Sequence, residues 1–257
     1  MDDIEILKEH FTGKNRAFFL AHPEYRIPAA DQRRLDEAIK RYQAGEPAAY
    51  ITGSASFFGR DFFVSPDCLI PRSDTEFLVQ KLIAALPRGG CFADLCTGSG
   101  CIAITALKQV SDCSCLAVDL SSKALAVAQK NAAIHDVSRR IVFMQADVLR
   151  PDFMLGYSFD CIVSNPPYIP SAVVDTLDES VKKEPRMALD GGEDGLRFYR
   201  FMIPAYMKFL NPGGTLLFEI GYDQGEAVKE ICIESGVACT VCKDLSGNDR
   251  VAIIKAI

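Results

Sequence analysis

The most informative segment of the sequence for the fold is Phe92-Ala93-Asp94-Leu95-Cys96-Thr97-Gly98-Ser99-Gly100-Cys101-Ile102-Ala103. Its first residues predict a buried strand and its last residues predict the start of a helix, so that the glycines lie in a tight turn between the two. Gly98 and Gly100 permit a positive φ and let a ligand approach the backbone where no Cβ stands in the way. Together with Ala103 they match the spacing of a dinucleotide-binding fingerprint. The stretch therefore predicts a loop that binds a cofactor.

The residues after this loop alternate between strand-like and helix-like patterns. The predicted strands lie near 91–96, 115–119, 140–146, 159–164 and 214–220, and the predicted helices lie near 100–110, 122–134 and 194–210. This alternation implies right-handed crossovers and a mostly parallel sheet covered on both faces. Two further strand-like runs, 237–243 and 250–257, flank Gly247-Asn248 and predict an antiparallel hairpin at one edge. The predicted fold class is therefore α/β, with a Rossmann-like sheet.

The sequence before the sheet divides into two smaller parts. Residues 1–53 are largely polar and predict a small N-terminal helical domain. Residues 54–72 predict a hairpin linker, and the main domain is expected to span residues 73–257. The first helix of the main domain is predicted to begin at Ser73, because Ser73 and Glu76 have the spacing of a capping box.

The overall composition is that of an ordinary soluble globular protein. The chain has 257 residues, of which 49% are apolar and 24% are charged. Its formal net charge of -6 argues against nucleic acid as a partner, because proteins that neutralise many phosphates usually present a basic face. No apolar run approaches the length of a membrane span, and the first residues do not resemble a secretion signal. We therefore expect a cytoplasmic protein that binds neither a membrane nor nucleic acid directly.

The ten cysteines do not form the pattern of a disulfide framework. Several lie in apolar runs, where a free cysteine behaves as a small hydrophobic residue. Cys239 and Cys242 have a ligand-like spacing, but residues three apart on a strand point to opposite faces. Only three histidines are present. We therefore expect free thiols in a reducing compartment and no bound metal.

Carboxylates near the ends of the predicted strands extend the cofactor site. Asp119 follows Gly100 by nineteen residues and is placed to accept hydrogen bonds from both hydroxyls of a ribose. Asp147 can receive an adenine amine, with Val148 packed beside the ring. Asp94 disfavours a pyrophosphate at the loop but can hold an ammonium group, directly or through water. The loop itself contributes Cys96, Thr97, Gly98, Ser99 and Gly100. These features fit S-adenosylmethionine, although the loop alone does not decide between cofactors.

The tetrapeptide Asn165-Pro166-Pro167-Tyr168 follows the predicted strand at 159–164. Ligands of an open parallel sheet bind beyond the carboxyl ends of its strands, so this tetrapeptide is expected beside the glycine loop. Asn165 Oδ1 and the Pro166 carbonyl can each accept one hydrogen of a planar –NH2 group, and Tyr168 supplies an aromatic wall. Most of the catalysis is then positioning and exclusion of water. The motif predicts methyl transfer to an amide or amino nitrogen.

With these motifs the sequence resembles the HemK/PrmC family of peptide chain release factor glutamine methyltransferases. The resemblance covers residues 47–257 and includes several shorter motifs. These are Tyr50-Ile51-Thr52-Gly53, Ile70-Pro71-Arg72-Ser73-Asp74-Thr75-Glu76, Glu184-Pro185, Gly191-Gly192-Glu193-Asp194-Gly195-Leu196 and Glu219-Ile220-Gly221. One departure is Cys96, at a position where the family usually has glycine.

The resemblance implies an S-adenosylmethionine-dependent enzyme of translation termination, which methylates the glutamine in the Gly-Gly-Gln motif of release factors. It also implies a seven-stranded sheet and an N-terminal helical domain that helps to dock the release factor. Asn165, Pro166 and Tyr168 would be catalytic, and Asn165 would also contact the cofactor. Pro167 and Arg72 would join these residues in binding the substrate. We expect the protein to act as a monomer.

Two other functions share part of the pattern. A nucleic-acid adenine methyltransferase would use the same Asn165–Tyr168 motif, but it should carry a basic cleft or a target-recognition domain. A nicotinamide-binding oxidoreductase fits the glycine spacing and leaves the Asn165–Tyr168 motif unexplained.

Overall fold

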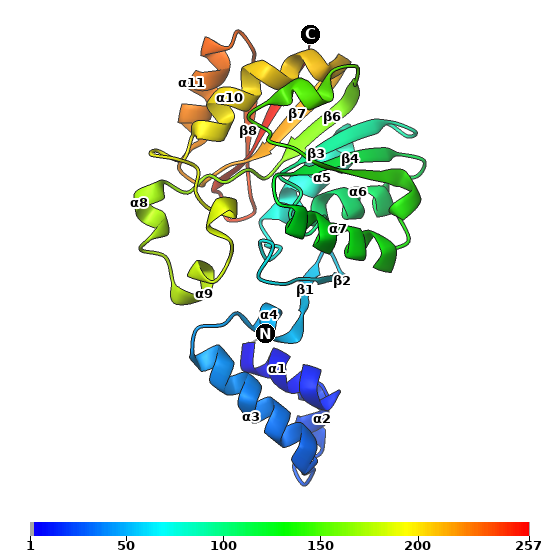
Figure 1. The fold of residues 1–257 in the computed structure, drawn as a ribbon, viewed down its shortest axis with the longest axis vertical. Helices are drawn as coiled ribbons and strands as arrows, with labels where there is room; N and C mark the ends of the chain where they lie inside the picture. Colours follow the sequence, from blue (N-terminus) through cyan, green and yellow to red (C-terminus); the bar gives the residue numbers. More distant parts are fainter. Residues whose placement is uncertain (1–2, 257) are drawn as a thin grey trace.

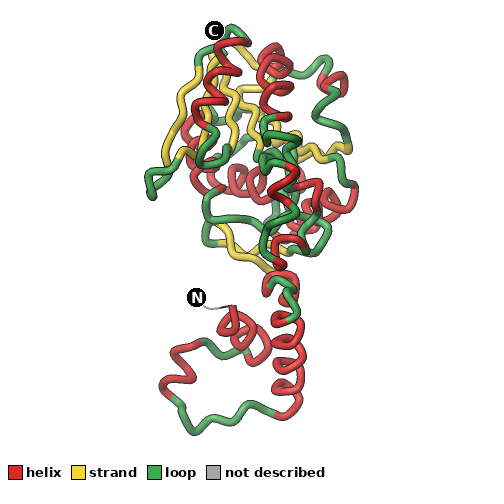
Figure 2. The backbone as a smooth tube through the Cα atoms, turned by 90° about the vertical axis from the view of Figure 1, so that its left-hand side faces the viewer, coloured by secondary structure: helices red, strands yellow, loops and turns green. Residues whose placement is uncertain are grey.

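The structure, a computed structural model, describes residues 3–256; the predicted ranges that include residues 1, 2 and 257 extend outside them. The molecule is elongated, with a small helical unit at one end and a large α/β unit at the other (Figures 1 and 2). The small unit contains α1 (Asp3–Thr12), α2 (Arg16–Ala21), α3 (Ala29–Gln43) and α4 (Ala48–Thr52). Its core consists of Leu7, Leu35, Ala38, Ala48 and Ile51.

A two-stranded hairpin joins the two units. Its strands, β1 (Ser54–Phe57) and β2 (Arg60–Phe63), pair antiparallel. The turn consists of Phe58 and Gly59, both at positive φ (52° and 70°), which is the backbone that a two-residue hairpin turn favours.

The first helix of the α/β unit begins differently from the prediction. Helix α5 (Thr75–Ala85) starts after Asp74, which makes no side-chain capping bond. The predicted capping box is wrong, because the Glu76 carboxylate accepts the N–H of Phe58 at 2.7 Å instead. Glu76 therefore fixes the turn of the hairpin to α5.

Seven strands form one sheet in the order β5-β4-β3-β6-β7-β9-β8. Their bounds are β3 (Cys91–Leu95), β4 (Ser114–Asp119), β5 (Ile141–Gln145), β6 (Phe159–Ser164), β7 (Leu210–Glu219), β8 (Cys239–Lys243) and β9 (Asp249–Lys255). Strands β3 to β7 pair in parallel, and β9 pairs antiparallel with β7 and β8. The predicted mostly parallel sheet with an antiparallel C-terminal edge hairpin is confirmed.

Helices cover both faces of this sheet (Figure 1). One face carries α5, α6 (Cys101–Gln109) and α7 (Ser122–Ile134), and the other carries α10 (Arg197–Tyr206) and α11 (Gly225–Glu234). Alternate residues of β3 serve the two faces, as the period of a strand requires. Phe92 packs with the α5–α7 layer, whereas Ala93 and Leu95 pack with α10 and α11.

Between β6 and α10 the chain leaves the sheet in an excursion that spans residues 169–196. It contains α8 (Ser171–Val174), α9 (Glu179–Lys182) and the 3-10 helix η3 (Arg186–Ala188). A parallel bridge between Ile169 and Asp190 closes its base. The other 3-10 helices are η1 (Ser138–Arg140), η2 (Pro151–Met154) and η4 (Met207–Phe209). The helix predicted near 194–210 is thus α10 followed by η4.

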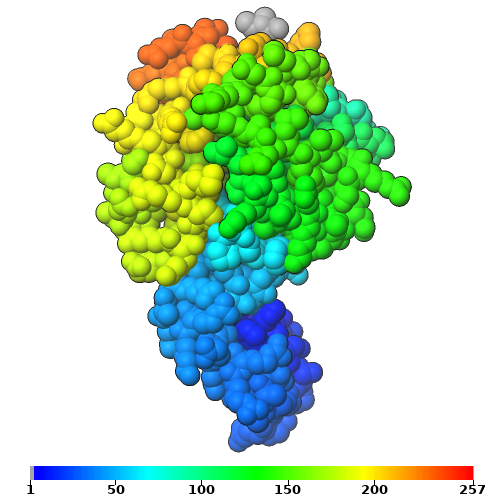
Figure 3. Space-filling model, viewed as in Figure 1, coloured from blue at the N-terminus to red at the C-terminus, as the bar shows by residue number. Residues whose placement is uncertain are grey.

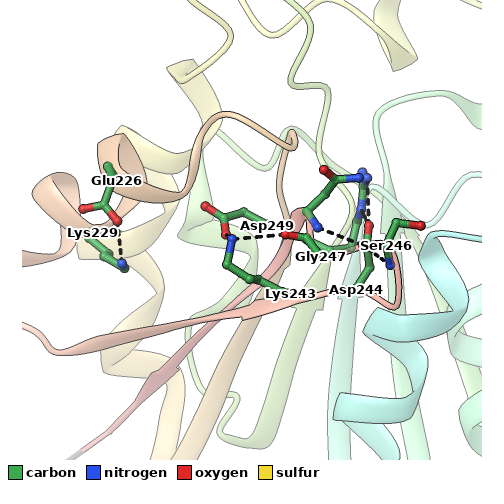
Figure 4. Close-up of polar contacts among 9 residues, drawn as sticks. Glu226, Lys229, Lys243, Asp244, Ser246, Gly247 and Asp249 are labelled. Carbon is green, nitrogen blue, oxygen red and sulfur yellow. Dashed lines mark hydrogen bonds and ion pairs between the residues drawn. The ribbon is translucent and has the colours of Figure 1, made fainter.

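Polar contacts fix the turn between β8 and β9 (Figure 4). Asp244 Oδ1 accepts the N–H of Ser246 at 2.9 Å, and Lys243 Nζ lies 3.0 Å from Asp249 Oδ1. The other oxygen of Asp244 lies 3.3 Å from the guanidinium of Arg250. This turn therefore holds the guanidinium of Arg250 beside the end of β7.

All ten cysteines are free thiols. Among residues 3–256, no helix combines the length and the apolar character needed to cross a membrane. Within the same range, no group of three or more histidine, cysteine, aspartate or glutamate side chains is arranged to hold a metal ion.

Candidate active site

A cavity of about 570 Å³ lies beyond the carboxyl ends of β3, β4, β5 and β6. This is where the strand order reverses between β3 and β6, the usual ligand site of an open α/β sheet. Figure 3 shows the excursion between β6 and α10, in yellow-green, meeting the green half of the α/β unit along a seam. The predicted site residues that line the cavity are Cys96, Gly98, Asp119, Asp147, Val148, Asn165 and Pro167.

Asp119 ends β4 and faces the cavity. Its Oδ2 accepts the N–H of Gly98 and its Oδ1 accepts the N–H of Ser121, both at 2.9 Å. Burial raises the pKa of the Asp119 carboxyl, and the two N–H groups oppose that shift. A carboxylate oxygen can accept more than one hydrogen bond, so both oxygens remain able to bind a ligand hydroxyl. One side chain thus shapes the glycine loop and presents two acceptors to the cavity.

The loop that follows β3 approaches the cavity through its backbone. Cys96 has a φ of 62°, in the left-handed region that costs a non-glycine residue roughly 1–2 kcal/mol. This conformation explains why a glycine is suited to the position. At Gly98 (φ 56°), an added Cβ would meet no described atom within 4 Å, so its open side faces free space. Gly100 lies deeper, where a Cβ would come within 3.1 Å of Ala128 Cβ, and it serves the packing of α6 on α7.

Asp94, near the end of β3, and the loop residues Thr97 and Ser99 are buried and do not line the cavity. Asp94 Oδ2 accepts the Thr97 hydroxyl at 2.6 Å and the Ala103 N–H at 3.2 Å. Burial raises the pKa of Asp94 to about 7. Its Oδ1 is buried without a hydrogen-bond partner within residues 3–256. Contact of Asp94 with an ammonium group stays a prediction, and its visible role is to hold the loop against the start of α6.

The residues after β5 form another wall of the cavity. Asp147 Oδ1 accepts the N–H of Leu149 at 2.9 Å, which fixes the turn after the strand. The Val148 side chain is 5% exposed, and its carbonyl accepts the Tyr206 hydroxyl at 2.8 Å. An acidic and an apolar residue therefore follow each other in the wall of the cavity that also contains Asp119, as an adenine ring would require.

Asn165 stands at the rim of the cavity where β6 ends. Its Nδ2 donates to the hydroxyl of Thr75, the first residue of α5, at 3.2 Å. This contact turns the amide so that Oδ1 is the group left for another donor. Pro167 lines the cavity beside it, and Pro166 is buried.

Tyr168 lies behind the Asn165 loop, and a role for its ring as a wall of the acceptor site stays a prediction. Tyr168 does not line the cavity; its ring packs against the core under α10 and α11. Its hydroxyl lies 3.3 Å from Glu219 Oε1 at the end of β7. Burial and the nearby Glu219 carboxylate raise the pKa of the Tyr168 hydroxyl. Tyr168 therefore anchors the Asn165 loop from behind.

The excursion braces the same loop through close backbone contacts. A Cβ at Gly191 would lie 2.8 Å from the Pro167 carbonyl, and one at Gly195 would lie 2.3 Å from the Tyr168 carbonyl. The Gln224 side chain also donates to the Tyr168 carbonyl at 3.0 Å. Only glycine allows this approach. The Gly191–Leu196 motif is thus explained by support of the acceptor loop.

Arg72 lies away from the cofactor cavity. It forms an ion pair with Glu184, whose side chain is 1% exposed and whose Oε2 accepts the N–H of Ile70 at 2.9 Å. Burial raises the pKa of Glu184, and Arg72 opposes that shift. Both residues line a second cavity, of about 940 Å³, between the small helical unit, the hairpin and α9. Contact of Arg72 with a substrate stays a prediction for this second cavity.

Several residues of the site were not singled out from the sequence. Leu120, Ser121, Ala146 and Phe198 line the cofactor cavity, and Thr75 holds Asn165. Leu120 and Ser121 come directly after Asp119, and Ala146 comes directly before Asp147. Their position next to these two predicted site residues was the available signal. Nothing local in the sequence links Thr75 to Asn165, because they are 90 residues apart.

Comparisons with known proteins agree with this architecture. The PrmC N-terminal domain matches residues 1–53, and the Methyltransferase small domain matches residues 73–194. The release factor glutamine methyltransferase of Moorella thermoacetica is 40% identical over 252 residues, covering 96% of this chain and 88% of the relative. That of Salmonella typhimurium is 40% identical over 251 residues, covering 97% and 90%.

A methyltransferase structure from Pyrococcus furiosus is similar with a TM-score of 0.58 at 21% identity, over 86% of this chain and 96% of that one, which shows the fold alone. The sheet order, the carboxylate that ends β4 and the Asn165 loop at the shared cavity define a methyltransferase. The similarity to the curated relatives extends over nearly the whole chain. The chain belongs to the release factor glutamine methyltransferase family.

Proposed function

We propose that this protein transfers a methyl group from S-adenosylmethionine to the side-chain amide nitrogen of the glutamine in the Gly-Gly-Gln motif of peptide chain release factors. One observation carries the proposal. Asn165 stands at the rim of a cavity that also contains Asp119, and its amide is turned so that Oδ1 is left to accept a hydrogen bond. The relatives' names supply the substrate class.

The cavity fits the proposed cofactor. Its volume of about 570 Å³ lies in the range of small-molecule sites. Asp119 would hold the ribose hydroxyls, Asp147 and Val148 the adenine, and the backbone at Gly98 the amino-acid part. When bound, S-adenosylmethionine supplies a methyl carbon activated by a sulfonium. The open space at Gly98, where a Cβ would meet no described atom, is the feature that admits a ligand against the backbone.

The chain's own residues would activate the acceptor by position. An amide nitrogen is a poor nucleophile because its lone pair is delocalised. Asn165 Oδ1 and the Pro166 carbonyl would each accept one hydrogen of the –NH2 group, which stabilises the positive charge that develops on nitrogen during transfer. Pro167 and the apolar part of the cavity would limit the access of water.

We infer further that the partner is a protein held between the two units of the chain. The second cavity, lined by the small helical unit and by Arg72 and Glu184, is the surface available for it. A single chain carries both the cofactor cavity and Asn165, so the enzyme would act as a monomer. As an enzyme acting on release factors, it would work in the cytoplasm, without direct contact with nucleic acid or a membrane.

The test is a transfer assay with labelled S-adenosylmethionine and three acceptors: purified release factors, DNA and transfer RNA. The proposal expects label in the release factors alone. Label in DNA or RNA, with none in the factors, would support the adenine methyltransferase and overturn the proposed substrate. Tight competition by a nicotinamide dinucleotide for the cofactor site would overturn the methyltransferase reading.

A further inference from the structure

Glu219 is a buried carboxylate behind the acceptor loop to which the proposed function gives no role. It ends β7, is 1% exposed and lies among residues of α5, the Asn165 loop and β9. Its Oε1 lies 3.3 Å from the Tyr168 hydroxyl. Its Oε2 has no hydrogen bond of standard geometry from any residue in the described range, but the Thr75 hydroxyl is close enough to lower the pKa of the carboxyl.

Thr75 connects this carboxylate to Asn165. Its oxygen accepts the Asn165 Nδ2 hydrogen at 3.2 Å, and its side chain is buried. A hydroxyl carries one hydrogen and two lone pairs. When the Thr75 hydrogen is directed to the Glu219 carboxylate, only lone pairs face Asn165, and these select the amide nitrogen.

We infer that Glu219, acting through the hydroxyl of Thr75, fixes which end of the Asn165 amide faces the acceptor. The inference rests on the proposed function for its consequence, since Oδ1 must face the –NH2 group for methyl transfer. Glu219 and Thr75 are then positioning residues, and neither touches the substrate. Without a carboxylate behind it, the Thr75 hydroxyl can donate to Asn165 Oδ1 and turn the amide the wrong way.

The environment of Glu219 makes this arrangement sensitive to pH. Burial raises its pKa to about 7, and the Thr75 hydroxyl, the charge of Arg250 and the Tyr168 hydroxyl hold it from rising further, whereas Asp74 raises it. The other titratable groups influenced by it are Tyr199 and Cys101. A protonated Glu219 donates to Thr75 instead of accepting from it. The correct amide orientation is therefore expected above about pH 7 and is lost as the pH falls below that value.

The variants that separate this relay from simple packing are Glu219→Gln, Thr75→Val and Thr75→Ser. Valine keeps the volume of threonine and removes the hydroxyl, whereas serine keeps the hydroxyl. Thr105→Val is the matched control, because Thr105 is fully buried in α6 and its hydroxyl has no hydrogen-bond partner among the described residues. Asn165→Ala identifies the signal of the Asn165 side-chain amide in a ¹⁵N–¹H spectrum.

The first measurement follows that amide signal in the free enzyme as a function of pH. The wild type and Thr105→Val should show a transition near pH 7, and Glu219→Gln and Thr75→Val should show none. The second measurement is transfer to a release factor. Thr75→Val should lower kcat about tenfold, the effect of losing one orienting hydrogen bond, with KM, cofactor affinity and melting temperature changed little. Thr75→Ser should restore most of kcat.

The inference is overturned if Thr75→Val keeps the wild-type kcat and amide titration. It is equally overturned if Thr75→Ser loses as much activity as Thr75→Val, since packing would then explain both. Failure of the proposed function looks different: the wild type would transfer no label to release factors. The amide titration would still decide whether Glu219 controls Asn165.

Discussion

Replacing Asp119 with alanine tests the cofactor site most sharply. Each oxygen of this carboxylate accepts a backbone N–H, that of Gly98 or that of Ser121, and the residue lines the cavity. The substitution removes the proposed acceptor of two ribose hydroxyls. Hydrogen bonds to a charged group contribute about 1.5–3 kcal/mol each, and we use the lower figure because the oxygens are shared with the backbone. Loss of one or both bonds then weakens cofactor binding between about tenfold and about a hundredfold.

The matched control is Asp160→Ala. Asp160 also accepts a backbone N–H, that of Cys91 at 2.8 Å, but it stands near the start of β6, at the amino ends of the strands and away from the cavity. Both variants lose a partly buried acceptor of backbone N–H groups and should lower the melting temperature. Only Asp119→Ala should weaken binding of S-adenosylmethionine in calorimetry. Equal affinities in Asp119→Ala and the wild type, or equal losses in both variants, would refute the placement of the ribose.

Three further perturbations follow from the same contacts. Asn165→Ala should lower turnover about a hundred- to thousandfold while cofactor affinity changes little, because one preorganised acceptor is lost and Asp119 and Asp147 remain; parallel losses in both quantities would mean that Asn165 serves mainly the cofactor. Arg72→Ala leaves the buried Glu184 carboxylate without its cation and should lower the melting temperature, and Glu184→Gln in the same chain should recover it; no recovery would show that Arg72 acts through other contacts. Glu219 has its pKa raised from 4.5 to about 7 in the fold, so its contribution to stability is complete below about pH 4.5 and is lost as the pH rises through about 7. Glu219→Gln should therefore gain stability relative to the wild type between these pH values, by up to about 1.4 kcal/mol per pH unit in denaturant titrations, and a pH-independent difference would contradict the raised pKa.

Local patterns in the sequence were sufficient to predict the sheet. The strand before Cys96, the turn at Gly98 and the helix after it follow from hydrophobic periodicity and from glycine placed where the backbone needs it. Asp119 was predictable for the same reason, because a carboxylate that ends the next parallel strand must lie beside the loop. The antiparallel C-terminal hairpin was likewise marked by two short apolar runs around Gly247-Asn248.

The contacts that orient the acceptor loop were not predictable in this way. Thr75 and Asn165 are separated by 90 residues, and Tyr168 and Glu219 by 51. The ring of Tyr168 turns into the core because the Glu219 carboxylate, which accepts its hydroxyl hydrogen, and the α10–α11 layer lie behind it. Both are distant from Tyr168 in the sequence. Glu76 was misassigned for the same reason: its real partner, the Phe58 N–H, belongs to the hairpin.

The proposed acceptor of the methyl group is the glutamine of the Gly-Gly-Gln motif. The most direct measurement is peptide mass analysis of a release factor after reaction with this protein and S-adenosylmethionine, beside the same factor with that glutamine changed to alanine. We expect a single added methyl group on the glutamine and none on the altered factor. Methylation of the altered factor at the normal rate would contradict this assignment.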